Sequence, residues 1–341
     1  MDYSVVIATR NRPEVLFQSI PILIAQDPPP KLVAIIDSSD SFQPVWNAPN
    51  GASGSKVEMI HNSAPPGLCR QRNLGLQLVN TEVVFFLDDD SILHPGFASA
   101  ILKVYSFDPS GISAVGGTEV HQPPLLFATG LADIPKDEGY TSRQSITSKS
   151  AGWRDRLAPD PIKLIANEHI KRISTRALPP DAKPVETITG FRMTFRTEVV
   201  RRFGFEEAFT RYAPFEDRDA SLQAWRHGTV LAARNAWVYH HRQPGKRERG
   251  FVLGASQILN LAYVVCKNTV PTSPIRKTLY RHIAMKLATT ALFAFRRYDR
   301  HRTLGQMFAL RKLPGFLNLE GEPLRSAYTR IADEINRSSS K

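Results

Sequence analysis

The sequence predicts an α/β fold, with a mostly parallel sheet flanked by helices, followed by a basic helical C-terminal region. Short, β-branched apolar runs alternate with helix-like segments through the first third of the chain, an alternation typical of βαβ units. Residues 1–240 carry 25 basic and 26 acidic side chains, whereas residues 241–341 carry 19 and 6. We therefore expect a nearly neutral α/β domain over residues 1–245 and a basic helical region over residues 246–341.

Four of the apolar runs are expected to be buried parallel strands. They cover residues 4–8, 32–36, 57–61 and 83–87, with helices expected at 13–26 and 69–78. Further strands are expected at 112–115, 185–189, 191–195, 230–232 and 236–239, and further helices at 197–203 and 216–227. Ligands bind beyond the carboxyl ends of parallel strands. The polar groups that follow three of these strands should therefore meet at one sheet edge: Thr9–Arg12, Asp37–Asp40 and Asp88–Asp90.

The composition is that of an ordinary globular protein. Apolar residues make up 42% of the 341 residues and charged residues 22%, which excludes disordered, collagen-like and coiled-coil classes. Two cysteines cannot build a disulfide framework and indicate a reducing compartment. Nothing at the start resembles a signal peptide, and no apolar run reaches the length of a membrane span. We expect a cytoplasmic protein, either soluble or peripheral to a membrane.

Three consecutive aspartates, Asp88 to Asp90, directly follow the fourth buried strand. Neighbouring carboxylates repel one another, so the folded state needs a compensating cation. Hard oxygen ligands favour Mg²⁺ or Mn²⁺. The simpler alternative is a solvated acidic turn that caps a helix near Pro95. The position directly after a buried strand favours the metal site.

A set of motifs, found in the same order over about residues 1–245, resembles the family 2 glycosyltransferases. The motifs are Val5–Arg12, Asp37, Arg70–Gly75, Phe86–Asp90, Gly190–Arg192, Phe215–Asp217 and His240–His241. The resemblance implies a Rossmann-like GT-A fold, with a nucleotide-sugar half at about residues 1–117 and an acceptor half at about 118–245. It also implies a metal-dependent, inverting enzyme that transfers a sugar from a nucleotide-diphosphate donor to a hydroxyl of a glycan or glycolipid. Such enzymes build polysaccharides or cell-envelope glycans.

The resemblance assigns donor-side roles to residues of the N-terminal half. Asp37 resembles the acid that accepts a hydrogen bond from the nucleobase, but the usual acidic-Gly-Ser run reads Asp-Ser-Ser-Asp here, which leaves the base open. Asp88 would lie near the ribose, and Asp90 would bind the metal directly. The other nucleotide-sugar-binding candidates are Thr9, Arg10, Arg12, Arg72, Asp89 and Gly190. An exposed helix face is the alternative for Arg72, a solvent-facing position for Asp89, and an ordinary tight turn for Gly190.

Two adjacent carboxylates, Glu216 and Asp217, resemble the catalytic pair of the family. The chemistry needs a carboxylate that accepts the proton of the acceptor hydroxyl while its oxygen attacks the anomeric carbon. The resemblance makes Asp217 this base, and the charge of Glu216 would raise its pKa towards the working pH. The alternative is that acids at a helix N-terminus are favoured by the dipole alone. Asp219 is the nearest rival for the role of base.

Two histidines, His240 and His241, complete the set of metal-ligand candidates. Neutral imidazole suits Mn²⁺, and both residues follow a predicted strand. Adjacent strand residues point to opposite faces, so we expect one of the two to bind, with His240 preferred. A surface histidine pair is the alternative.

The segment 276–312 interleaves arginine and lysine with aliphatic and aromatic residues. One interpretation is that its helices lie on an anionic membrane surface, at the inner face of a cytoplasmic membrane, where a lipid-linked glycan acceptor would be found. The other is that they pack on the catalytic domain and leave a solvated basic face.

The sequence leaves three alternatives to glycosyl transfer. A sugar-phosphate nucleotidyltransferase would normally show a glycine-rich phosphate loop after the first strand, where this chain reads Thr9-Arg-Asn-Arg-Pro13. A nucleic-acid-binding protein could use the basic tail, but finger spacings and RNP-like motifs are missing from the sequence, so no nucleic acid is expected as a partner. A related protein that binds a nucleotide without turnover is the third.

Overall fold

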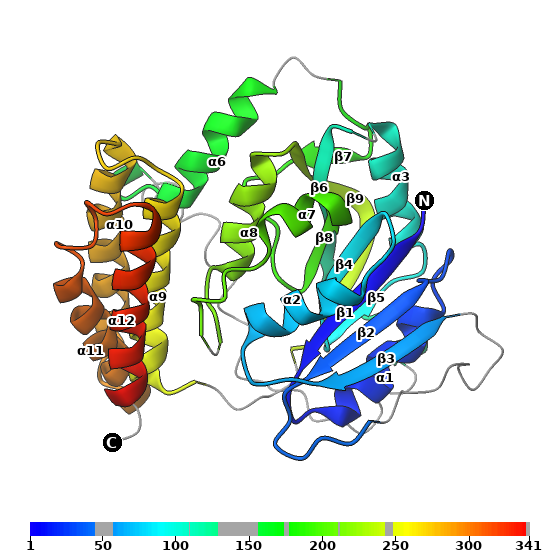
Figure 1. Ribbon diagram of the computed structural model, residues 1–341, viewed down its shortest axis with the longest axis horizontal. Helices are drawn as coiled ribbons and strands as arrows, with labels where there is room; N and C mark the ends of the chain where they lie inside the picture. Colours follow the sequence, from blue (N-terminus) through cyan, green and yellow to red (C-terminus); the bar gives the residue numbers. More distant parts are fainter. Residues whose placement is uncertain are drawn as a thin grey trace. The chain divides into compact units, whose positions relative to one another are not determined.

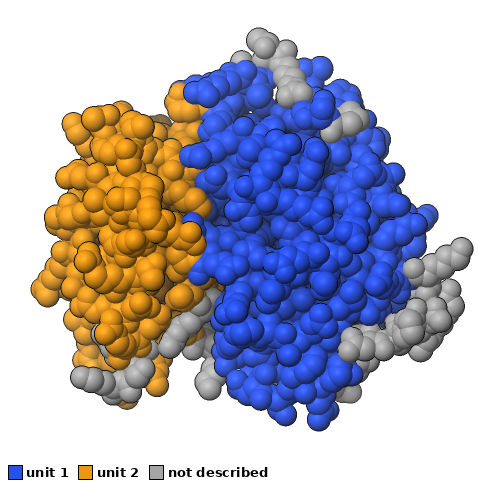
Figure 2. All heavy atoms as spheres, viewed as in Figure 1, with its two compact units in different colours: residues 1–134, 169–207, 216–243 blue, residues 135–168, 208–215, 244–341 orange. Residues whose placement is uncertain are grey.

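The computed structural model describes residues 1–44, 57–108, 110–128, 156–173, 177–210, 212–242 and 248–338. The chain divides into two compact units, coloured separately in Figure 2. The first unit comprises residues 1–134, 169–207 and 216–243, and the second comprises residues 135–168, 208–215 and 244–341. The first contains the sheet, and the second contains the four helices at the end of the chain.

A nine-stranded sheet is the framework of the first unit (Figure 1). Its strands are β1 (Tyr3–Thr9), β2 (Leu32–Asp37), β3 (Glu58–Ser63), β4 (Val83–Asp88), β5 (Ser91–Leu93), β6 (Ile112–Val120), β7 (Ala182–Pro184), β8 (Arg192–Arg196) and β9 (Thr229–His240). They are ordered β3-β2-β1-β4-β8-β6-β9-β5, and β7 also pairs with β9. The first four strands are parallel, as are β6 and β9, whereas β5, β7 and β8 run antiparallel to their neighbours. The α/β class is therefore confirmed.

Helices cover both faces of the parallel strands. The helices of the first unit are α1 (Pro13–Ile24), α2 (Leu68–Leu78), α3 (Phe97–Phe107), α4 (Leu125–Ala128), α7 (Thr197–Phe203) and α8 (Glu216–Trp225), whereas most of α6 (Pro161–Arg172) belongs to the second unit. Val5 of β1 belongs to one apolar core with Ile20 of α1 and Phe97 of α3. The next residue, Val6, points to the opposite face, where it meets Gly75 of α2. Burial on both faces explains why these strands are continuous apolar runs.

The strand expected at residues 185–189 does not form. The indole of Trp225 donates to the carbonyl of Val185, and the N–H of Ile188 donates to the hydroxyl of Ser221. These two backbone groups therefore bond to side chains of α8 instead of a neighbouring strand. The strands expected at 230–232 and 236–239 are parts of the single strand β9. The three-residue strands β5 and β7 are too short to show an alternating pattern in the sequence.

The second unit contains a group of helices, as expected for the basic C-terminal region. They are α9 (Gly250–Lys267), α10 (Pro274–Ala291), α11 (Arg297–Lys312) and α12 (Gly321–Ser338). A Cβ on Gly254 of α9 would overlap the backbone of Arg302, and one on Gly305 of α11 would overlap the backbone of Phe251. The two glycines thus allow the backbones of α9 and α11 to approach closely.

Within the part of the chain that the structure describes, α9 alone is long and apolar enough to cross a membrane. It has 18 residues and a mean hydropathy of 1.3, so it is longer than the apolar runs expected from the sequence. However, 72% of this window is buried by the protein itself. Length and composition do not separate a membrane span from the core helix of a soluble unit.

We predict that Gly75→Ala destabilises the first unit by about 1–3 kcal/mol, because the added Cβ overlaps Val6 in a packed layer. The loss should appear even though alanine is the better helix former by about 1 kcal/mol. Urea unfolding followed by circular dichroism measures it. Gly315→Ala is the control, because a Cβ there meets open space. An unchanged or raised stability of Gly75→Ala would contradict this packing.

Candidate active site

The ends of four strands bring polar side chains to one edge of the sheet. Thr9 at the end of β1 is in register with Asp37 at the end of β2, and Ala8 is in register with Asp88 at the end of β4. His240 ends β9 and pairs with Ser91 of β5, directly after the aspartate triplet. The short strand β5 therefore joins the triplet to the histidine.

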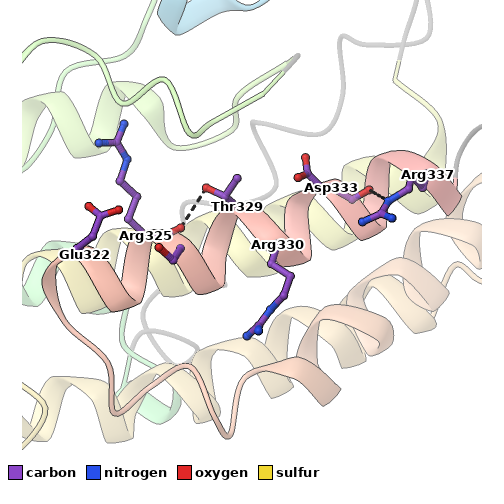
Figure 3. Close-up of a pocket in the computed structure, with 7 residues that line it drawn as sticks. Glu322, Arg325, Thr329, Arg330, Asp333 and Arg337 are labelled. Atoms are coloured by element: carbon purple, nitrogen blue, oxygen red, sulfur yellow. Dashed lines mark hydrogen bonds between the residues drawn. The ribbon is translucent and has the colours of Figure 1, made fainter.

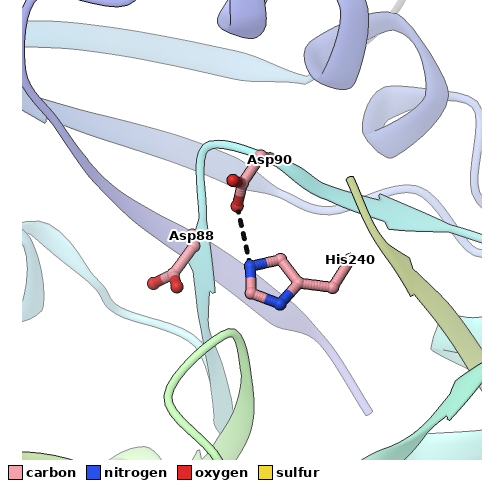
Figure 4. Close-up of side chains that lie close together, drawn as sticks. All are labelled: Asp88, Asp90 and His240. Carbon is pink, nitrogen blue, oxygen red and sulfur yellow. Dashed lines mark ion pairs between the residues drawn. The ribbon is translucent and has the colours of Figure 1, made fainter. Parts of the chain in front are cut away.

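Asp88, Asp90 and His240 form a cluster in which one ligand atom from each residue lies within 4.8 Å of the others (Figure 4). His240 Nε2 is 3.2 Å from Asp90 Oδ1. The ring of His240 stacks on Phe191, with a centroid distance of 4.3 Å and an interplanar angle of 12°, which fixes its plane. Two carboxylates and one imidazole are suitable donors for Mg²⁺ or Mn²⁺. The residues present therefore fit a divalent cation.

The pKa values in this cluster follow from burial and from neighbouring charges. Burial raises the pKa of Asp88, and the like charge of Asp90 adds to this, while Arg72 opposes it. Burial alone would lower the pKa of His240, but its hydrogen bond to Asp90 and the charge of Asp90 raise it overall. A bound cation would favour the ionised carboxylates and the neutral imidazole.

Asp89 is buried and directed towards the connection between β1 and α1, so the solvent-facing alternative is wrong. Its Oδ2 accepts from the hydroxyl of Thr9 at 2.7 Å and from Arg12 Nε at 3.1 Å. A second guanidinium nitrogen of Arg12 contacts Asp89 Oδ1, which makes the pair bidentate. Burial raises the pKa of Asp89 to about 7, although Arg12 lowers it. Asp89 therefore holds Arg12 and Thr9 in place.

Arg72 is completely buried, so the exposed-face alternative is also wrong. Its guanidinium donates to Glu216 Oε1 at 2.5 Å, to Asp88 Oδ1 at 3.2 Å and to the carbonyl of Gly190 at 3.2 Å. It also lies over the ring of Phe205, 5.2 Å from the centroid. Burial alone would lower the pKa of Arg72, but the carboxylates raise it overall. Arg72 thus links the metal-binding candidate Asp88 to the carboxylate pair of α8.

The two carboxylates of α8 lie in different environments. Burial raises the pKa of Glu216 to about 8, with a further contribution from the charge of Asp217. Asp217 is only partly buried, and its Oδ2 accepts from the N–H of Gly190 at 3.1 Å. Asp219 is 2% exposed. Of the three acids, Asp217 is the one whose carboxylate a substrate can reach.

Gly190 lies at the point where these groups meet. A Cβ at this position would be 2.9 Å from Glu216 Oε1 and 3.2 Å from the guanidinium of Arg72. Any larger residue would therefore push against the buried pair. The lack of space beside Glu216 and Arg72 is enough to explain why a glycine stands at position 190, and no bound sugar is needed for the explanation.

Asp37 is held in place by two neighbours. Its Oδ2 is 3.2 Å from His61 Nε2 on β3, and its Oδ1 accepts from the hydroxyl of Ser39 at 2.5 Å. Phe42 packs edge-on against His61, with a centroid distance of 5.1 Å. Arg10 is half exposed and pairs with Asp40 at 2.9 Å. His61 was not among the sequence-based candidates, because a histidine in a half-buried strand gives no distinctive pattern.

Two other contributors were also missed in the sequence. The side-chain amide of Gln71 donates to the carbonyls of Thr9 and Ile36 at 3.0 and 2.7 Å, and so ties the ends of β1 and β2 together. The position of Gln71 between two arginines on a short helix was the available signal. Phe191, which supports His240, was seen only as part of a motif.

His241 lies near the ring of Phe127, with a centroid distance of 5.0 Å, and is not part of the cluster in Figure 4.

The N-terminal part of the chain is similar to a known protein family. Residues 4–146 match the family described as Glycosyl transferase family 2. No curated protein sequence matches the chain.

Several solved structures resemble the chain at low sequence identity. GalNAc-T7 with UDP, GalNAc and Mn²⁺ is 15% identical at a TM-score of 0.49, and the match covers 78% of this chain but only 47% of that one. S. aureus TarS 1-349 is 11% identical, and its complex with UDP is 12% identical, each at a TM-score of 0.49. Both TarS matches cover 99% of this chain and 92% of the other.

The cluster geometry predicts Mn²⁺ binding that depends on His240 and not on His241. We expect His240→Ala to weaken binding about tenfold or more, because one of three ligand atoms is lost. His241→Ala is the matched control and should stay within about twofold of the wild type. Electron paramagnetic resonance of free Mn²⁺ measures both. Equal effects of the two substitutions would contradict this assignment.

The burial of Arg72 predicts that Arg72→Met destabilises the protein by roughly 3 kcal/mol or more. The substitution leaves the buried acceptors of Glu216 and Gly190 without their donor. Arg70→Met, on the exposed side of the same helix, should change the free energy of unfolding by less than about 0.5 kcal/mol. Urea unfolding compares the two. Similar values for both would show that Arg72 does not anchor the site.

Proposed function

We propose that this protein, whose residues 4–146 match Glycosyl transferase family 2, transfers a sugar from a nucleotide-diphosphate donor to a hydroxyl group with inversion and with a divalent metal. The acceptor we propose is a glycan or a lipid-linked glycan, in polysaccharide or cell-envelope biosynthesis. The observation that carries the proposal is the link from the Asp88–Asp90–His240 cluster, through Arg72 and Gly190, to Asp217.

On the donor side, Asp88, Asp90 and His240 are the residues that would hold Mg²⁺ or Mn²⁺. A cation held there would supply positive charge to offset the charge that develops on the departing nucleoside diphosphate. Asp37 is fixed by His61 and Ser39 and offers a carboxylate that can accept from an N–H of the nucleobase.

On the acceptor side, Asp217 removes the proton from the attacking hydroxyl group. The hydroxyl oxygen forms a bond to the anomeric carbon while the bond from that carbon to the diphosphate oxygen breaks, and a single displacement inverts the configuration. The N–H of Gly190 and the first turn of α8 orient the Asp217 carboxylate. Glu216 is 7% exposed and its Oε1 accepts from Arg72, so it is not free to receive the proton of an acceptor and does not compete as the base. It is a positioning residue that acts through Arg72.

The assignment of the base predicts different losses for two neighbouring substitutions. Asp217→Asn should lower kcat by about 10²- to 10⁴-fold, the usual contribution of a general base, with donor binding unchanged. Glu216→Gln should lose less than about tenfold, because an amide oxygen still accepts from Arg72. The donor is first identified by metal-dependent thermal stabilisation with UDP-, GDP-, dTDP- and CDP-sugars. Product formation is then followed by NMR.

Two results would contradict the proposal. A product that keeps the anomeric configuration of the donor would exclude a single displacement with Asp217 as base. A larger loss in Glu216→Gln than in Asp217→Asn would exchange the roles of the two residues. The control for folding is the circular dichroism spectrum of each variant.

A further inference from the structure

Exposed apolar side chains are concentrated where α10 turns into α11. Leu292 is 74% exposed and Phe295 is 78% exposed. Phe293, which is 42% exposed, lies beside Phe295 with a ring-centroid distance of 6.4 Å. Single exposed apolar residues are common on protein surfaces, but adjacent large ones indicate an interaction site. We call residues 292–296 the apolar tip.

The exposed face of α11 continues this surface. Leu304 and Met307 are exposed and are three residues apart, so they lie on the same side of the helix. Arg297, Arg300 and Arg311 are exposed as well and follow the same three- and four-residue spacing. The face is therefore a row of arginines with apolar side chains between them.

The charge of the hairpin formed by α10 and α11 is almost entirely of one sign. Residues 274–312 contain ten arginines and lysines and a single acidic residue, Asp299. At the tip, the guanidinium of Arg296 lies over the ring of Phe295, 5.5 Å from its centroid. An apolar surface surrounded by arginines is complementary to a layer that has hydrocarbon beneath anionic headgroups.

The outer face of α12 in the same unit provides a contrast (Figure 3). It carries charges of both signs along a shallow hollow, whose lining includes Glu322, Arg325, Thr329, Arg330, Asp333 and Arg337. Three arginines and two carboxylates are mixed there, so this face attracts neither an anionic nor a cationic surface strongly.

We propose that the α10–α11 hairpin docks the protein on an anionic lipid membrane. Leu292, Phe293 and Phe295 enter the boundary between headgroups and acyl chains, and the arginines of the hairpin contact the headgroup phosphates. Nucleic acid fits less well, because its phosphates would pair with the arginines and leave the apolar tip in water. A second copy of the chain also fits less well, because two hairpins of the same strong charge would face each other.

Flotation of the full chain with vesicles tests the proposal. We expect the protein to float with vesicles of phosphatidylcholine and phosphatidylglycerol, and to stay at the bottom with phosphatidylcholine alone. Leu292→Ser/Phe295→Ser should lower the partition coefficient about tenfold or more. Phe107→Ser, at a position 48% exposed at the end of α3, is the control and should remain within about twofold of wild type.

A fluorescent label at the tip tests insertion directly. The two native cysteines are buried, so Phe295→Cys labelled with an environment-sensitive dye should report from the tip. Its emission should shift to shorter wavelength with the anionic vesicles, and the same dye on Phe107→Cys should not shift.

Three outcomes would overturn the proposal. One is the absence of flotation with anionic vesicles at low salt, and another is unchanged partition of Leu292→Ser/Phe295→Ser. The third is concentration-dependent self-association that this double variant abolishes, which would assign the tip to a second copy of the chain. None of these readouts depends on turnover, so each leaves the proposed glycosyl transfer to its own test.

Discussion

A buried positive charge on Arg72 is the constraint on which the rest of the site depends. A guanidinium that is cut off from water must be surrounded by acceptors, and here they come from three distant parts of the chain. Asp88 ends β4, the carbonyl of Gly190 precedes β8, and Glu216 begins α8, 144 residues from Arg72. Satisfying this one side chain therefore fixes the start of α8 against the edge of the sheet where the metal-binding candidates lie. The position of Asp217 follows, because it is the next residue of the same helix and accepts from the N–H of Gly190.

The three adjacent aspartates also need partners that offset their charges. Three adjacent carboxylates would repel one another if they shared a single environment. The fold gives the three carboxylates different partners: Arg72 for Asp88, Arg12 for Asp89, and His240 with a longer contact from Arg12 for Asp90. As a result Asp89 turns towards the β1–α1 connection, while the first and third members of the triplet face the same region as His240. The first and third aspartates are thus available to the cluster with His240, whereas the middle one is occupied by Thr9 and Arg12.

The sequence predicted those features that depend on local patterns. The continuous apolar runs of β1, β2 and β4 indicated strands buried on both faces, and the polar groups after them indicated the edge where a site forms. The partners of Arg72 could not be predicted in this way, because a buried and an exposed arginine have the same local surroundings on a short helix. Residues 185–189 have the apolar pattern of a strand, but only the N–H of Val185 bonds to β9, at Val230, and the next backbone groups bond to Ser221 and Trp225 of α8. His61 was missed because its importance comes only from the register that places it beside Asp37.

The C-terminal unit contains two apolar segments, one of which is mostly buried and the other mostly exposed. Helix α9 is apolar enough to cross a membrane, yet most of it is buried, because Gly254 and Gly305 let α11 approach its backbone. The apolarity of α9 is thereby explained by packing. The apolar side chains at positions 292 and 295 are mostly exposed, so packing within the described chain does not explain them. Apolar side chains left in water do not contribute the favourable free energy of burial. The arginines around them repel a like-charged partner. The physical difference between the two segments is therefore that the first already has its apolar partner, and the second still requires one.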